Sequence, residues 1–81
     1  MFNKLKKIAN VNGLYGVMEK TKEECNELIE AIEGNVEEEI IDETADVFVM
    51  LFQLMLILDI ENKVYDRIDY KIDRTEKRLG I

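Results

Sequence analysis

The chain has 81 residues, 36% of them charged, with a formal net charge of −7 and no histidine. This length predicts a single domain spanning residues 1–81. The acidic balance excludes a generic electrostatic nucleic-acid binder, which would be basic, so we expect no nucleic-acid partner. Cys25 is the only cysteine, which excludes an intrachain disulfide and a cysteine-based zinc cluster.

The composition is typical of an all-α protein. Proline is absent, four residues are glycine, and Leu, Ile, Glu and Lys predominate. A chain this short buries little core on its own. We therefore predict a small antiparallel helical bundle completed by oligomerisation, with a homodimer as the default and a homotetramer as the other option.

The first segment, residues 2–10, predicts a short helix that uses Phe2, Leu5 and Ile8. Three lysines lie near its start, but the apolar run of a signal peptide does not follow them, so we expect a cytoplasmic protein. Residues 10–13 predict a break, because Asn and Gly mark turns.

Residues 14–33 predict a long helix. Its apolar and small side chains recur at helical spacing and form one stripe, made by Leu14, Val17, Met18, Thr21, Cys25, Leu28, Ile29 and Ile32. We expect Gly34 just past its end, where glycine commonly follows a helix. A third helix follows at residues 36–58, and its acidic first turn suits the positive end of a helix dipole.

Residues 47–58 of that third helix are apolar all round, apart from Gln53. The run is too short for a bilayer, which needs about 20 apolar residues, and we expect no membrane association. A helix that is apolar on every side needs other helices around it, which is a further reason to expect an oligomer.

A break at Asp59 and a last helix over residues 60–79 complete the expected elements. The apolar positions of this helix are Val64, Ile68, Ile72 and Leu79. Basic residues accumulate toward its end.

Two pairs of acids lie at the edges of the apolar stripes of neighbouring helices. At about 100° per residue, Glu24 and Glu27 are the acids of residues 14–33 that look inward. Glu43 and Asp46 share the inward face of residues 36–58. Because a short turn makes these two helices antiparallel, we expect the two pairs to lie opposite each other.

The other acids of these helices are expected to form a solvated face: Glu23, Glu30, Glu33, Glu37, Glu38 and Asp42. Glu39 is the intermediate case, because it shares the inward face one turn before Glu43.

Four facing carboxylates repel one another unless a positive charge lies between them. With no histidine, the available ligands are all oxygen, which suits Mg²⁺, Mn²⁺ or Ca²⁺ rather than zinc or copper. A di-iron carboxylate bundle is excluded, because it needs histidines in E-x-x-H motifs. The residues therefore predict a hard divalent ion, which typically recruits phosphates as further ligands.

Two segments carry a family resemblance, KEECNELIEAI at residues 22–32 and EIIDETADVFVMLFQL at residues 39–54. They resemble the MazG-like, all-α NTP pyrophosphohydrolase superfamily, whose pattern is EExxEL-x-x-A, a spacer, and ExxD before a long apolar helix. The resemblance implies that four residues are Mg²⁺ ligands, with Mn²⁺ as the other option: Glu24, Glu27, Glu43 and Asp46. YKIDRTEKR at residues 70–78 resembles the family's K-x-x-R segment, which implies that Lys71 and Arg74 contact substrate phosphates.

The resemblance implies hydrolysis of a nucleoside triphosphate between its α- and β-phosphates, giving a monophosphate and pyrophosphate. The metal would clamp phosphate oxygens and lower the pKa of a water molecule. Either Glu24 or Glu27 would orient or deprotonate that water, and the two remain alternatives. The base and the sugar that the site prefers do not follow from the sequence.

Two other functions remain open. Within the same superfamily, the placement of Lys20 before Glu23–Glu24 resembles the motif of phosphoribosyl-ATP pyrophosphohydrolase. The apolar run of this chain, however, lacks the Tyr-His pair that is expected in that enzyme. From a different class, residues 47–58 also fit a non-catalytic helical oligomerisation module. That module predicts no stabilisation by divalent metal or nucleotide.

Overall fold

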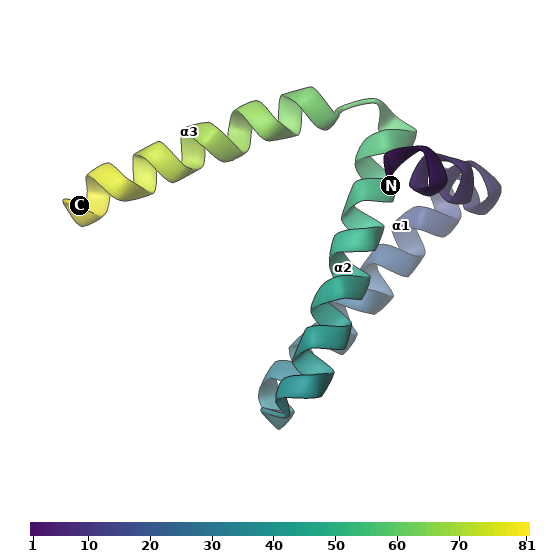
Figure 1. The fold of residues 1–81 in the computed structure, drawn as a ribbon, viewed down its shortest axis with the longest axis horizontal. Helices are drawn as coiled ribbons and strands as arrows, with labels where there is room; N and C mark the ends of the chain where they lie inside the picture. The colour runs from purple at the N-terminus through teal and green to yellow at the C-terminus, as the bar shows by residue number, and fades with distance from the viewer.

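The structure, a computed structural model, describes residues 1–81 and is built from helices joined by short turns (Figure 1). The helices are α1 (Phe2–Gly34), α2 (Glu37–Leu58) and α3 (Glu61–Leu79), and there is no strand. The predicted all-α class is therefore confirmed. None of these helices combines the length and the apolar character that crossing a membrane requires.

Helix α1 is interrupted at Gly13, where the backbone takes φ 75° and ψ 161°. The predicted break after the first helical segment is thus confirmed, although the helix continues to Asn12 and no loop intervenes. Figure 1 shows residues 2–12, which we call the N-terminal arm, turned back beside the C-terminal half of α2. There the rings of Phe2 and Phe52 meet edge to face, with centroids 5.3 Å apart.

The rest of α1 packs antiparallel to α2. The centre of the contact between α1 and α2 is formed by Ala9 of the arm together with Val17 and Met50, with Leu54 and Ile57 packed against them. Val17 belongs to the stripe predicted for residues 14–33. In the first segment the structure buries Leu5 and Ala9, whereas the expected Ile8 is 48% exposed. The burial of these residues is the main apolar stabilisation within one chain.

The turn between α1 and α2 depends on Asn35 rather than on the glycine before it. Gly34 is the last helical residue, and Asn35 adopts the left-handed conformation with φ 56° and ψ 37°. Its backbone N–H donates to the carbonyls of Ala31 and Ile32. The prediction that Gly34 follows the helix was wrong by one position, because asparagine also tolerates the left-handed region.

Helix α3 leaves α2 at a second left-handed residue, Asp59, with φ 56°. Figure 1 shows α3 extending away from the α1–α2 pair, so that the chain has a bent, L-shaped outline. It contacts α2 and not α1, and none of its residues is buried. Within one chain, the expected antiparallel bundle is therefore only the α1–α2 pair.

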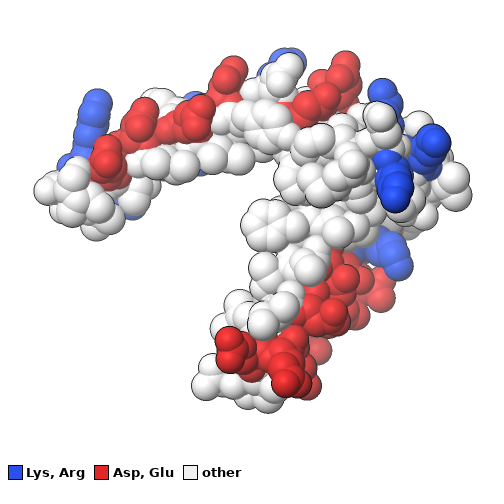
Figure 2. Space-filling view, viewed as in Figure 1, with Lys and Arg blue, Asp and Glu red and all other residues white.

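Two apolar surfaces remain uncovered. The first is the side of α2 turned away from residues 14–34, which we call the outer seam: Ile41, Ala45, Phe48, Phe52 and Met55. Phe52 is the seam residue that meets the N-terminal arm, through the ring of Phe2. Ile41 is 61% exposed and Phe48 is 56% exposed. Figure 2 shows uncharged surface along the edge of α2 that faces the bend, and along the adjoining edge of α3.

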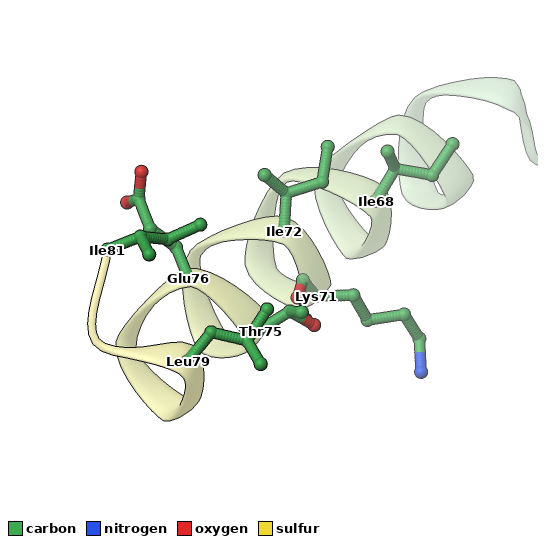
Figure 3. A pocket seen from close by; sticks show the side chains of 7 residues that line it. All are labelled: Ile68, Lys71, Ile72, Thr75, Glu76, Leu79 and Ile81. Carbon is green, nitrogen blue, oxygen red and sulfur yellow. Dashed lines mark hydrogen bonds between the residues drawn. The ribbon is translucent and has the colours of Figure 1, made fainter.

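The second surface is the apolar stripe of α3. Ile68, Ile72 and Leu79 line a shallow groove of about 470 Å³ with nothing packed over them (Figure 3). Ile72 is 59% exposed. An amphipathic helix normally turns such a stripe toward a core, so α3 presents a face that lacks a partner within its own chain.

Candidate metal centre

Four acids meet where α1 and α2 run side by side. Glu24 and Glu27 come from α1, Glu43 and Asp46 come from α2, and all four are half-buried. One carboxylate oxygen from each of Glu24, Glu27 and Glu43 lies within 4.8 Å of the other two. The spacing of three residues puts each pair on one face of its helix, and the antiparallel packing brings those faces together.

Asp46 belongs to a second group of acids that overlaps the first. Its carboxylate oxygen, with those of Asp42 and Glu43, forms this group, which has the same 4.8 Å size. Glu43 is common to both groups and therefore lies at the centre of the cluster. Asp42 is exposed, and the helical wheel placed it with the solvated acids. Asp42 lies at the edge of the cluster. The only feature of the sequence that could have indicated this position is that Asp42 directly precedes Glu43.

The remaining acids of α1 and α2 lie at the surface, as Figure 2 shows for the acidic side of the helix pair. Those with exposed side chains are Glu19, Glu23, Glu30, Glu33, Glu37, Glu38 and Glu39. Glu39 nevertheless lines a hollow of about 470 Å³ together with Glu27 and Glu43. The interior cluster thus opens onto solvent through a passage whose walls are acidic.

Two oxygens of the cluster have no partner. Glu24 Oε2 and Glu43 Oε2 are both buried from water and neither makes a hydrogen bond. The one ion pair of the structure, between Lys22 and Glu19 at 3.4 Å, is exposed and lies outside the cluster. A buried charged oxygen without a partner is costly, so this arrangement calls for a cation or a proton.

The protonation of Glu24 and Glu43 reflects this crowding. The pKa of Glu24 is raised from 4.5 to about 7, first by burial, next by repulsion from Glu27, and further by Asp46 and Glu43. The pKa of Glu43 is also raised, by burial and then by Glu27, with smaller effects from Asp46 and Asp42. In the absence of metal, a proton is the only available means of relieving this repulsion.

The donor set fits a hard divalent cation. All its ligand atoms are carboxylate oxygens, which Mg²⁺ and Mn²⁺ prefer. The two unpartnered oxygens, Glu24 Oε2 and Glu43 Oε2, are the atoms that such an ion would satisfy. Zinc or iron sites rich in nitrogen or sulfur are excluded, because the chain has no histidine and Cys25 is its single thiol.

A pocket of about 370 Å³ adjoins the cluster and shares Glu24 and Asp46 with it. Lys20 also lines this pocket and is the one cationic side chain in its wall. Its opposite end carries two amides, in which Asn12 Nδ2 donates to Gln53 Oε1 at 3.1 Å. Sequence reasoning noted Gln53 only as an exception in an apolar run and missed its pairing with Asn12.

Lys71 and Arg74 are not brought to the acids by their own chain. Both are exposed on α3, which does not contact α1. Lys71 extends from the rim of the groove in Figure 3, and the Arg74 guanidinium stands over the ring of Tyr70, 5.8 Å from its centroid. A phosphate held at the cluster would therefore lie away from these cations of the same chain.

A family model described as the MazG nucleotide pyrophosphohydrolase domain matches residues 14–79. The match includes both acid pairs and α3 and omits the N-terminal arm. Comparisons with curated proteins and with solved structures found no match. The resemblance seen in the sequence is thus confirmed, and at family level this domain is a hydrolase, typically dependent on a divalent metal. Because this family model matches well over half of the residues of the chain, the chain belongs to the MazG nucleotide pyrophosphohydrolase domain family.

Proposed function

We propose that the protein is a Mg²⁺-dependent nucleoside triphosphate pyrophosphohydrolase that releases a nucleoside monophosphate and pyrophosphate. The observation that carries this proposal is the pair of buried, unpartnered oxygens, Glu24 Oε2 and Glu43 Oε2, in a cluster of facing carboxylates. Such a cluster favours a divalent ion, and the family supplies the reaction class.

The metal ligands in this proposal are Glu24, Glu27, Glu43 and Asp46, with Mn²⁺ as a substitute ion. A bound ion would supply charge to the phosphate oxygens and acidify a water molecule. In the reaction, the oxygen of water forms a bond to the α-phosphorus, and the bond between the α-phosphorus and the oxygen that bridges it to the β-phosphorus breaks. The electron pair of that bond leaves with pyrophosphate. Glu24 or Glu27 accepts the proton of the water, and the two remain alternatives.

Lys71 and Arg74 complete the phosphate site in this proposal, but they do so from a second copy of the chain. At about 100° per residue, all the cations of α3 except Lys77 gather on one flank of its apolar stripe. They are Lys63, Arg67, Lys71, Arg74 and Arg78. The acids Asp66, Asp69, Asp73 and Glu76 occupy the other flank. A partner that covered the stripe would therefore meet a row of positive charge beside it, which complements the acidic α1–α2 surface.

The outer seam of α2 supports the same assembly. Its positions, from Ile41 to Met55, alternate spacings of four and three residues, which is the pattern of a helix–helix seam. A homodimer formed through this seam, or a homotetramer made from two such dimers, would cover the seam, and the stripe of α3 would be covered where a partner's α1–α2 pair packs on it. The seam also favours the second candidate function, a non-catalytic oligomerisation module, which needs no metal.

The test is a product assay on a panel of canonical and modified NTPs and dNTPs with Mg²⁺, Mn²⁺ or EDTA. Pyrophosphate and orthophosphate are quantified separately, and phosphoribosyl-ATP is included because Lys20 lines the pocket beside Glu24. Metal-dependent pyrophosphate with the matching monophosphate is the expected result. Orthophosphate as the product would contradict the proposed bond. No turnover together with no thermal shift by Mg²⁺ would favour the oligomerisation module.

A further inference from the structure

The pocket between the N-terminal arm and α2 has two chemically different ends. One end is acidic and belongs to the metal centre, through Glu24 and Asp46. The other end carries the amides of Asn12 and Gln53. We propose that the second end is a nucleobase subsite in which Asn12 and Gln53 determine which base is accepted. This inference rests on the proposed function, since it takes the phosphates of the ligand to lie at the acids.

The size and the walls of the pocket fit the nucleoside part of a nucleotide. Its volume of about 370 Å³ lies within the usual range for small-molecule sites, roughly 300–1,000 Å³. Ile8 comes from the arm, and Val49 and Met50 come from α2, so the apolar wall has two sides. A flat aromatic base gains contact area between such walls, while its polar edge needs hydrogen-bonding groups at the end.

Gln53 is the polar group that such an edge would meet. Its side chain is 2% exposed, although it lies within the most apolar stretch of the chain. Its Oε1 accepts a hydrogen bond from Asn12, but its Nε2 donates only to the sulfur of Met50, at 3.5 Å. A thioether is a weak acceptor, so the amide retains donor capacity for a better partner.

Asn12 supplies the complementary group. Its Nδ2 is engaged with Gln53, and its side-chain oxygen makes no hydrogen bond. Together the two amides offer an unused acceptor, Asn12 Oδ1, beside a donor, Gln53 Nε2, whose partner is only a thioether. The edge of a nucleobase likewise carries a donor beside an acceptor, whereas a phosphate or a sugar alone does not offer this pairing on a flat ring.

The chain holds Asn12 in place through its neighbours. Leu5 and Ala9 of the arm are buried, and Phe2 packs on Phe52 of α2. Gly13 follows directly and turns the chain with a backbone conformation that favours glycine. The arm therefore acts as a positioning element for the base end, while the acids depend on α1 after Gly13 and on α2.

The experiment separates the base end from the phosphate end by using two kinds of probe. Titration calorimetry measures the Kd of nucleoside monophosphates of the four bases, and of Mg²⁺ with inorganic tripolyphosphate, which has no base. The variants are Gln53→Met, which keeps the length of the side chain and removes the amide, and Asn12→Ala. Asn10→Ala is the control, because Asn10 is exposed on the same arm and does not line the pocket.

Both variants are expected to raise the Kd of the preferred monophosphate by about 10-fold, the effect of losing one or two buried hydrogen bonds. The ratio between bases should fall toward one, and the tripolyphosphate Kd should stay unchanged. In turnover, KM should rise for the preferred triphosphate more than kcat falls. Asn12→Ala tests the inference even where Gln53→Met fails to fold, because Asn12 is exposed.

Equal losses for all bases and for tripolyphosphate would overturn the inference, since they indicate general damage to the site. An unchanged ratio between bases would also overturn it. A failure of the proposed function gives a different pattern: base-selective binding that Gln53→Met abolishes, with no pyrophosphate produced from any triphosphate. Metal-dependent turnover that both substitutions leave unchanged would support the hydrolase function and overturn the proposed base subsite.

Discussion

The carboxylates of Glu27 on α1 and Glu43 on α2 approach each other across the helix pair, with oxygens within 4.8 Å. Neither helix supplies a cation between them, and repulsion from Glu27 is the largest effect after burial on the pKa of Glu43. This repulsion therefore lowers the stability of the folded, metal-free chain. Protonation of the cluster or binding of a metal ion would relieve it, so stability depends on both pH and metal.

The first prediction concerns pH and the stability of the metal-free protein. The folded pKa of Glu24, about 7, exceeds its ordinary value of 4.5. The contribution of a group raised in this way is fully present below pH 4.5 and is lost as pH rises through about 7. The melting temperature in EDTA should therefore fall over this interval, and Glu24→Gln should reduce the fall. An unchanged pH profile in the Glu24→Gln variant would show that Glu24 keeps an ordinary pKa.

The second prediction concerns metal and pH together. Mg²⁺ competes with the protons held by Glu24 and Glu43, so its affinity should rise as pH passes through about 7. The gain in melting temperature from millimolar Mg²⁺ should be larger at pH 8 than at pH 6. Glu33→Gln is the control, because Glu33 is an exposed acid of the same helix. A gain that does not vary with pH would argue against binding at these carboxylates.

The third prediction separates activity from stability at the centre of the cluster. Glu43→Gln removes a proposed ligand and should lower kcat/KM by about 100-fold or more, beyond the roughly 10–100-fold cost of losing an outer partner of a metal site. The same change removes repulsion, so the metal-free variant should melt higher than the wild type. A variant that loses both activity and metal-free stability would instead indicate simple misfolding.

The fourth prediction tests whether the phosphate site is shared between chains. A Glu43→Gln chain is mixed and refolded with a chain carrying Lys71→Ala and Arg74→Ala. In a two-fold dimer with shared sites, half of the dimers are mixed and each has one intact site, so activity should return to about a quarter of the wild-type value. No recovery, with both variants folded and dimeric by sedimentation, would place each site within one chain.

The fifth prediction concerns the bend at Gly13. A Cβ at Gly13 would meet no atom within 4 Å, so the cost of Gly13→Ala lies in the backbone, at φ 75°. We expect a loss of about 1–3 kcal/mol in the free energy of unfolding, measured with urea. Gly34→Ala is the matched control, with equal space but a helical backbone, and should gain about 0.5–1 kcal/mol. Equal effects of the two substitutions would contradict this account.

The sequence allowed the helices and the inward acids to be predicted because both depend on local spacing. Glu24 and Glu43 lie at the edges of apolar stripes, and a short turn at Asn35 makes the stripes meet. No long-range information is needed for that arrangement, apart from the antiparallel packing that a short connection requires.

Two features could not be predicted in the same way. The pairing of Asn12 with Gln53 joins residues 41 positions apart, and it depends on how the arm folds back at Gly13. The direction of α3 depends on what packs against its apolar stripe. An apolar residue such as Ile72 predicts that something covers the stripe, but not whether the covering residues come from the same chain or from another. Lys71 and Arg74 were therefore predicted by resemblance, while their distance from the acids was not.

The small buried core has a further consequence. Only seven of 81 residues are buried in a single chain, and none of them lies in α3. Because the heat capacity change and the denaturant slope of unfolding scale with newly exposed surface, a lone chain should show small values of both. A steep, sharply cooperative transition, shifting to higher temperature as the protein is concentrated, would then measure association rather than the fold of one chain.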